Sequence, residues 1–148
     1  MDDQLFEKYL ADRYEDQIGW YDKKAALNKR RFAFAKTIVI AGSIAVPVIL
    51  SFEAAPVWIA SLLAALVAIT EGLSGAFKYH ENWMNYRTTC ETLRKERHLL
   101  EAGLEEYGSS DNPKALFVQR VENVISRENT LWLKNAKDSS KSQKHDPS

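Results

Sequence analysis

Few side chains in this sequence combine the type and spacing that chemistry requires. His80 and Glu81 are adjacent, as in a zinc-protease helix, but that motif needs a second histidine four residues after the first, and position 84 is Met84. The single cysteine, Cys90, falls among apolar residues, where a small buried side chain is a better interpretation than a nucleophile. No glycine-rich phosphate loop or nucleophile elbow is present. The sequence therefore predicts no enzyme, no cofactor and no metal site.

The carboxylate of Glu71 raises a different question, because it directly follows an apolar run that ends at Thr70. An unpaired carboxylate in such surroundings is costly, so a residue of this kind is usually paired or functional. Lys36 directly precedes another apolar run, and in an antiparallel hairpin the two residues lie at the same depth when counted from the tip. We predict an ion pair between Lys36 and Glu71 near the membrane boundary, and consider a proton carrier the weaker alternative.

The middle of the chain is almost free of charge. The whole sequence has 20 basic and 20 acidic residues, so no net field attracts nucleic acid. Between Thr37 and Phe77, however, the charged residues are Glu53 and Glu71 alone. Two apolar segments, Thr37–Phe52 and Ala54–Thr70, fit a pair of membrane-spanning helices extended by their flanking residues. The alternative is a buried hairpin in a soluble protein, but so short a chain has little other apolar surface to cover it.

Basic residues flank this hairpin and are absent from its tip. By the positive-inside rule, this distribution predicts that both termini are cytoplasmic. Lys29, Arg30 and Arg31 stand just before the first span, where we expect contacts with lipid headgroups rather than with nucleic acid. One cysteine allows no internal disulfide and suits a reducing compartment.

Apolar periodicity continues on both sides of the hairpin. Before it, residues recur at steps of three and four, as on one face of a helix that Gly19 could interrupt: Phe6, Tyr9, Leu10, Tyr14, Ile18 and Tyr21. After it, a coiled-coil-like seam alternates steps of four and three, and we expect it to hold copies of the chain in register: Tyr79, Trp83, Tyr86, Cys90, Leu93, Arg97, Leu100, Leu104 and Tyr107.

The seam continues directly from the second span. We therefore expect one unbroken helix from about Ala55 to Tyr107, with Gly108 as its C-terminal cap. Asn112 and Pro113 then open another helix, because proline suits the first turn.

Small and polar residues share one side of the second span, and large apolar residues lie opposite. This stripe consists of Ala60, Ala64, Ala68, Glu71, Gly75 and Lys78. Most such stripes are packing surfaces, since small residues let transmembrane helices approach closely. The sharper hypothesis is that the stripe lines a pathway in an oligomer. In the first span, Gly42 and Ala45 could receive it.

These observations predict an all-α protein with a two-transmembrane helical hairpin, flanking cytoplasmic helices that form a bundle, and a disordered C-terminal tail. One domain is expected at 1–136. Within it we expect a cytoplasmic helix at 1–31, spans at 33–52 and 54–77, a cytoplasmic helix at 78–107 continuing the second span, and another at 112–135, before a tail at 137–148.

Three stretches around the hairpin, in this order, carry a resemblance: YLADRYEDQIGWYDKKAALNKRRF, EGLSGAFKYHENWMNYRTTCETLRKE and VENVISRENTLW. They resemble the bacterial SLATT group, the SMODS and SLOG-associating two-transmembrane effector domains, and within it the membrane domain of unknown function 4231 type. The similar positions are Asp16, Gln17, Trp20, Tyr21, Asn28, Arg30, Arg31, Glu71, Gly72, Lys78, Tyr79, Glu81, Asn82, Trp83, Tyr86, Arg87, Glu128 and Asn129.

The resemblance implies a bacterial inner-membrane protein that acts as a homo-oligomeric pore-forming effector in defence or signalling systems. It brings no catalytic residue. The expected partners are the lipid bilayer and further copies of the chain. No nucleotide sensor is fused to this chain, so the trigger is expected from a separate protein that senses a nucleotide signal, from a small ligand or from nothing at all. The alternative is a non-conducting membrane anchor or scaffold whose cytoplasmic helices bind a partner protein.

Overall fold

The computed structural model describes residues 2–53 and 55–142, with the backbone alone for Glu128, Asn129 and 131–142. Within this part the chain is helical and has no strand, which confirms the all-α prediction. The elements are α1 (Asp3–Tyr9), the π-helical η1 (Leu10–Tyr14), α2 (Glu15–Leu50), α3 (Val57–Ala76), α4 (Tyr79–Ala102), the 3-10 turn η2 (Glu105–Tyr107) and α5 (Pro113–Ser142).

The chain forms two compact units, which are described separately. The hairpin unit is Asp22–Tyr86, and the terminal unit joins Met1–Tyr21 with Arg87–Ser148. Helices α2 and α4 contribute residues to both.

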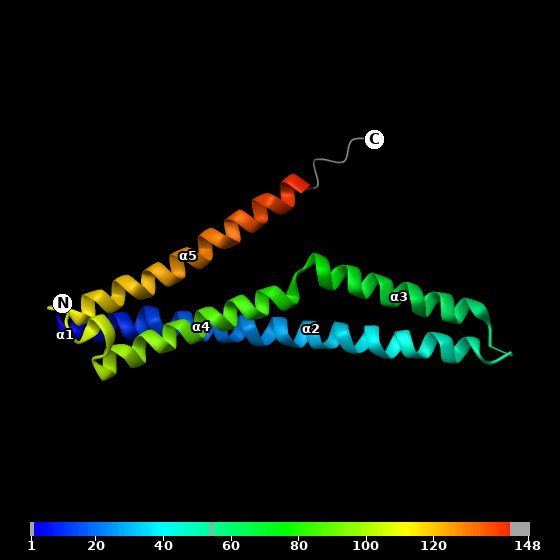
Figure 1. Ribbon diagram of the computed structural model, residues 1–148, viewed down its shortest axis with the longest axis horizontal. Coiled ribbons are helices and arrows are strands. Elements are labelled where there is room, and N and C mark those ends of the chain that lie inside the picture. The colour runs from blue at the N-terminus through cyan, green and yellow to red at the C-terminus, as the bar shows by residue number, and fades with distance from the viewer. Residues whose placement is uncertain (1, 54, 143–148) are drawn as a thin grey trace. The chain divides into compact units, whose positions relative to one another are not determined.

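The hairpin unit contains the two apolar segments, and its helices α2 and α3 run side by side in opposite directions (Figure 1). The apolar stretches within Asp3–Leu50 and within Val57–Tyr107 are each long and apolar enough to cross a membrane, and most of their side chains are exposed. Pro47 lies inside α2, and the Ser51 N–H after it donates to the Pro47 carbonyl at 3.1 Å. The predicted helical hairpin is thus confirmed.

Helix α3 packs on α2 through positions spaced three and four residues apart. Ala60 is 2% exposed and Ser74 is 8% exposed. A Cβ added at Gly42 would lie 2.4 Å from Val67 Cγ2 and 3.7 Å from Leu63 Cδ1, so Gly42 lets the two helices approach closely. Gly42 therefore receives Val67 and Leu63. Val67 and Leu63 are not members of the small stripe, and the expectation that Gly42 and Ala45 receive that stripe stays a prediction.

The second helical run is interrupted, whereas an unbroken helix was predicted. Helix α3 ends at Ala76, Lys78 has a φ of 49°, and α4 begins at Tyr79 (Figure 1). The physical reason is a change of phase. At about 100° per residue, the five steps from Ser74 to Tyr79 turn a continuous helix by about 140° beyond one full turn. Tyr79 would then point away from α2, and one left-handed residue re-orients α4 toward it.

The terminal unit is built around a core from its N-terminal, α4 and α5 segments. The buried side chains are Phe6, Leu10, Tyr14, Tyr21, Cys90, Leu93, Tyr107, Phe117, Val121 and Ile125. Phe117 is at its centre, with ring centroids 5.8 Å from Phe6 and 5.4 Å from Tyr14. Gly19 does not interrupt α2. The irregularity is the π-turn at Leu10–Tyr14, which changes the helical phase within the N-terminal segment.

Glycines end α4 earlier than predicted. Gly103 has a φ of 59°, its N–H donates to the Leu100 carbonyl at 3.1 Å, and the Leu104 N–H donates to the Leu99 carbonyl at 3.0 Å. These two bonds define a Schellman motif, so Gly103 is the cap residue that Gly108 was predicted to be. Gly108 instead allows close approach, because a Cβ there would lie 2.5 Å from the Gly103 carbonyl oxygen.

Helix α5 begins as predicted and extends further than predicted. The Ala115 N–H donates to Asn112 Oδ1 at 3.1 Å, with Pro113 at the first helical position. The helix continues through Ser142, so 137–142 of the expected disordered tail are helical. The physical reason is that this stretch lacks large apolar residues but contains no glycine or proline to stop a helix. Residues 143–148 lie outside the described part.

Candidate functional site

The structure brings Lys36 and Glu71 together across the hairpin. Lys36 Nζ lies 2.7 Å from Glu71 Oε1 and 3.0 Å from Oε2, so the ammonium contacts both carboxylate oxygens. Both side chains remain partly exposed in the single chain. Each of these charges alone would be unfavourable beside hydrocarbon, and pairing compensates both. We therefore expect the Lys36–Glu71 pair to stabilise the hairpin.

The predicted small stripe of α3 is divided by the packing of the hairpin. Ala60 is buried, whereas Ala64, Ala68, Gly75 and Lys78 are exposed. The large side chains opposite are also exposed, including Leu62 at 62% and Ile69 at 59%. Helix α3 therefore uses one face for α2 and leaves two unlike faces, one small and one large, exposed among the residues that the structure describes.

Cations and aromatic rings meet where the hairpin joins α4. Lys29 Nζ lies 5.6 Å from the centroid of the Trp83 ring, and Arg31 Cζ lies 5.9 Å from that of Tyr79. Arg30 is exposed and contacts neither ring in the described geometry. The three predicted headgroup residues are thus at the base of the first apolar segment, and two are held by cation–π contacts from the second helical run.

The central residues of the α4 seam pack against other segments of the same chain. Cys90 and Leu93 are both 0% exposed, and the Tyr14 hydroxyl donates to the Leu93 carbonyl at 2.9 Å. Leu100 is half-buried, and Leu104 lies beyond the end of α4 with 55% exposure. Tyr79, Trp83 and Tyr86 are half-buried in the hairpin unit. A second copy cannot reach Cys90 and Leu93 while the terminal unit stays folded, so any assembly needs a different surface.

Among the described residues, His80, His98 and Cys90 do not lie together. His80 packs against the ring of Phe32 at 4.8 Å, while exposed His98 lies 3.9 Å from Glu101. Within the part of the chain that the structure describes, no group of three His, Cys, Asp or Glu side chains is arranged to hold a metal ion.

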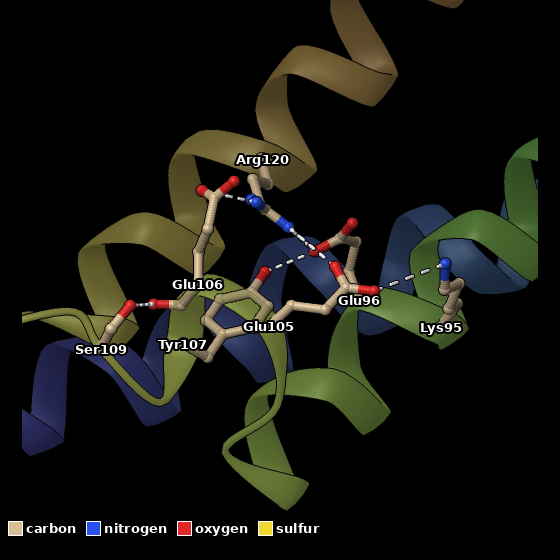
Figure 2. A network of polar contacts seen from close by, with 7 residues as sticks. All are labelled: Lys95, Glu96, Glu105, Glu106, Tyr107, Ser109 and Arg120. Carbon is tan, nitrogen blue, oxygen red and sulfur yellow. Dashed lines mark hydrogen bonds and ion pairs between the residues drawn. The ribbon is translucent and has the colours of Figure 1, made fainter.

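Sequence reasoning missed a polar network in the terminal unit (Figure 2). Arg120 Nη2 lies 2.7 Å from Glu106, and its Nη1 lies 3.4 Å from Glu96 and 3.8 Å from Glu105. The guanidinium also covers the Tyr107 ring at 5.2 Å, and the Tyr107 hydroxyl donates to Glu96. The network fastens the turn after α4 to α5. No sequence spacing signals it, because its members come from separate elements.

A second missed cluster joins the N-terminal segment to α5. Arg13 Nε and Nη2 each lie 3.2 Å from a different Glu122 oxygen, and the Tyr9 hydroxyl donates to Glu122 Oε1 at 2.9 Å. The hydrogen bond from Arg13 lowers the pKa of the Glu122 carboxyl, which stays ionised and bound. Both clusters serve the terminal unit as structural contacts.

A family model described as protein of unknown function (DUF4231) matches residues 16–115. The chain belongs to this family. This confirms the coarser part of the resemblance. No curated protein matches the chain, and no solved structure matches it.

The DUF4231 match includes most of the features described above and leaves out some of the core. The Lys36–Glu71 pair, the left-handed Lys78 and the α4 seam all lie inside the matched residues. Phe117 and Glu122, which fasten α5 to the N-terminal segment, lie outside them.

Exchanging the charges of Lys36 and Glu71 tests their pairing in this DUF4231 protein. Glu71→Lys places two cations together, and we expect it to lower hairpin stability in detergent by about 1 kcal/mol or more. Adding Lys36→Glu restores opposite charges and should recover part of the loss. Unfolding followed by circular dichroism in a denaturing-detergent titration measures both. Simple additivity in this double-mutant cycle would contradict a direct interaction.

Alkaline pH should weaken the terminal unit, because burial raises the pKa of Tyr14 to about 12. A neutral phenol is favoured in the folded state, so the contribution is complete below the ordinary pKa of 10.0 and is lost as the pH rises toward 12. The pKa values of Tyr9 and Tyr107 are raised too, mainly by burial. We expect the melting temperature to fall above pH 10, and to fall less steeply in Tyr14→Phe. Equal slopes for both proteins would contradict this role.

Proposed function

We propose that this DUF4231 protein is a SLATT-type effector that inserts into the bacterial inner membrane and permeabilises it as a homo-oligomer. The observation that carries the proposal is the free small face of α3. The hairpin packs through Ala60 and Val67 and leaves Ala64, Ala68 and Gly75 exposed. Small side chains on this face leave room for water between several copies, whereas the large apolar side chains on the opposite face suit contact with acyl chains.

In this proposal the same face lines a conduit in the oligomer. A two-helix hairpin cannot enclose water, but several copies can, and Glu71 and Lys78 then lie along its continuation toward the charged flank. Opposite, exposed Leu62, Leu66 and Leu73 suit lipid contact. In this proposal the trigger is supplied by a separate protein that senses a nucleotide signal, as the resemblance to the SLATT group implies.

The orientation belongs to this proposal. We propose that both termini are cytoplasmic, and the positive-inside rule supports this because Lys and Arg occur on both flanks and not at the tip. In a Cys90→Ala background, an impermeant thiol reagent added to cells should label Ser51→Cys and should not label Ser109→Cys. Labelling of Ser109→Cys and not of Ser51→Cys would contradict this orientation and show that the termini are outside the cytoplasm.

Substitutions on two faces of α3 test the conduit. Ala64→Leu should narrow it and reduce membrane depolarisation on overexpression by about tenfold, whereas Leu62→Ala on the opposite face should have little effect. Insertion and oligomer size, measured by labelling and by size-exclusion chromatography in detergent, should stay the same. The contradicting result is an oligomer in which Ala64→Cys resists water-borne thiol reagents even when the activating system is switched on. That result would favour a non-conducting anchor or scaffold.

A further inference from the structure

Two residues, Phe77 and Lys78, lie between α3 and α4. Phe77 still has helical dihedrals, with φ −82° and ψ −5°, and α4 begins at Tyr79 directly after Lys78. Lys78 has a φ of 49°, a left-handed conformation in which the Cβ of any residue other than glycine crowds the backbone. The chain therefore holds a strained residue at the base of the hairpin.

The bent joint is held by contacts that depend on it. The Asn82 side-chain amide donates to the Phe77 carbonyl at 3.1 Å and satisfies an acceptor that the break has deprived of its helical partner. Tyr79 and Trp83, the first aromatic residues of α4, meet the cations Arg31 and Lys29 of α2 at 5.9 Å and 5.6 Å. These cation–π contacts exist because the left-handed residue turns α4 toward α2.

A straight joint is equally consistent with the sequence. No glycine or proline occurs between Lys78 and Ala102, so nothing in this stretch forbids a continuous helix. If Lys78 adopts right-handed dihedrals, its strain disappears and the Phe77 carbonyl can accept the Glu81 N–H as in any helix. Tyr79 and Trp83 then rotate by about 140° away from α2 and lose both cations.

We propose that the Lys78 joint is a two-state hinge, in which α3 and α4 exchange between the bent form and one continuous helix. Each state has favourable contacts that the other lacks, which is the requirement for a bistable element. A lipid or protein that contacts the Tyr79 and Trp83 face in one state only will shift the ratio of the two. This inference goes beyond membrane permeabilisation and does not depend on it, because the two forms are distinguished by distance.

Spin labels on either side of the joint can measure both states in the full-length protein. With Ala65→Cys and Met84→Cys in a Cys90→Ala background, both labelled positions are exposed and belong to the hairpin unit. In a continuous helix their Cα atoms are about 28 Å apart, and in the bent form they are closer. Pulsed electron–electron double resonance in phosphatidylcholine–phosphatidylglycerol vesicles should resolve two distances between the labels. The shorter distance should belong to the major population and the longer one to the minor population.

Variants at the joint should move the two populations in opposite directions. Lys78→Gly removes the left-handed penalty and should enrich the short distance about tenfold, whereas Lys78→Val should enrich the long one to a similar extent. Asn82→Ala removes the carbonyl cap and should also favour the long distance. Ala76→Val places the same branched side chain in ordinary helix and serves as the matched control, for which no change is expected.

The outcome that overturns the hinge is one unchanged short distance in wild type and all four variants, each shown by circular dichroism to remain helical. That result would establish a rigid bend. A two-population result would support the hinge whether or not the protein permeabilises membranes, so the two proposals are tested separately.

Discussion

Phe117→Ala is expected to lower the free energy of unfolding of the terminal unit by about 3–5 kcal/mol. The Phe117 side chain is 0% exposed and its ring touches those of Phe6 and Tyr14, so truncation removes contacts to the N-terminal segment and leaves a cavity. A loss of this size is a large share of the stability of an ordinary domain. Thermal unfolding followed by circular dichroism in detergent, together with limited proteolysis of α5, measures the effect.

Two controls separate the cavity from other effects of the substitution. Phe117→Leu keeps most of the volume and should cost less than about 1.5 kcal/mol. Leu104→Ala removes a side chain that is 55% exposed and should change stability by less than about 0.5 kcal/mol. If Phe117→Ala unfolds no more easily than Leu104→Ala, the assignment of this core is wrong. The Lys36–Glu71 coupling in the hairpin unit should persist in Phe117→Ala.

The second large effect is expected at the closest approach of the hairpin helices. Gly42→Ala places a Cβ 2.4 Å from Val67 Cγ2, a distance that real Cβ contacts do not show, so α2 and α3 must separate or Val67 must move. Overpacking of this kind costs about 1–3 kcal/mol. A denaturing-detergent titration of the purified protein should show the hairpin unfolding at lower detergent fraction.

A size exchange tests that explanation directly. Val67→Ala removes the clashing methyl groups, so Gly42→Ala with Val67→Ala should be more stable than Gly42→Ala alone, with a coupling of about 1 kcal/mol or more. Gly72→Ala is the matched control, because a Cβ there meets nothing within 4 Å and alanine favours the helix by up to about 1 kcal/mol. If Gly42→Ala behaves as Gly72→Ala does, the close approach at Gly42 is refuted.

Several features of the protein follow from the sequence alone, because they depend on local composition and period. The two apolar segments, Thr37–Phe52 and Ala54–Thr70, are sufficient to predict two apolar helices and the hairpin that they form. Steps of three and four residues identify the buried faces of separate helices, such as Phe6, Leu10 and Tyr14. The Asn112–Pro113 start of α5 follows from cap chemistry, which acts within one turn.

The tertiary structure decided how these faces are combined. Periodicity gives the direction of a buried face only relative to the axis of its own helix, so it could not show that Ser74 and Tyr79 both turn toward α2. For both residues to face α2, helix α4 must be turned by about 140° relative to a straight continuation of α3. The left-handed conformation of Lys78 provides this turn, and no local pattern in the sequence predicts it. For the same reason, the α4 seam could be read equally well as an interface between copies or as the chain's own core. Tyr14, 79 residues from Leu93 in sequence, occupies that seam, because contacts between distant segments arise only when the chain folds.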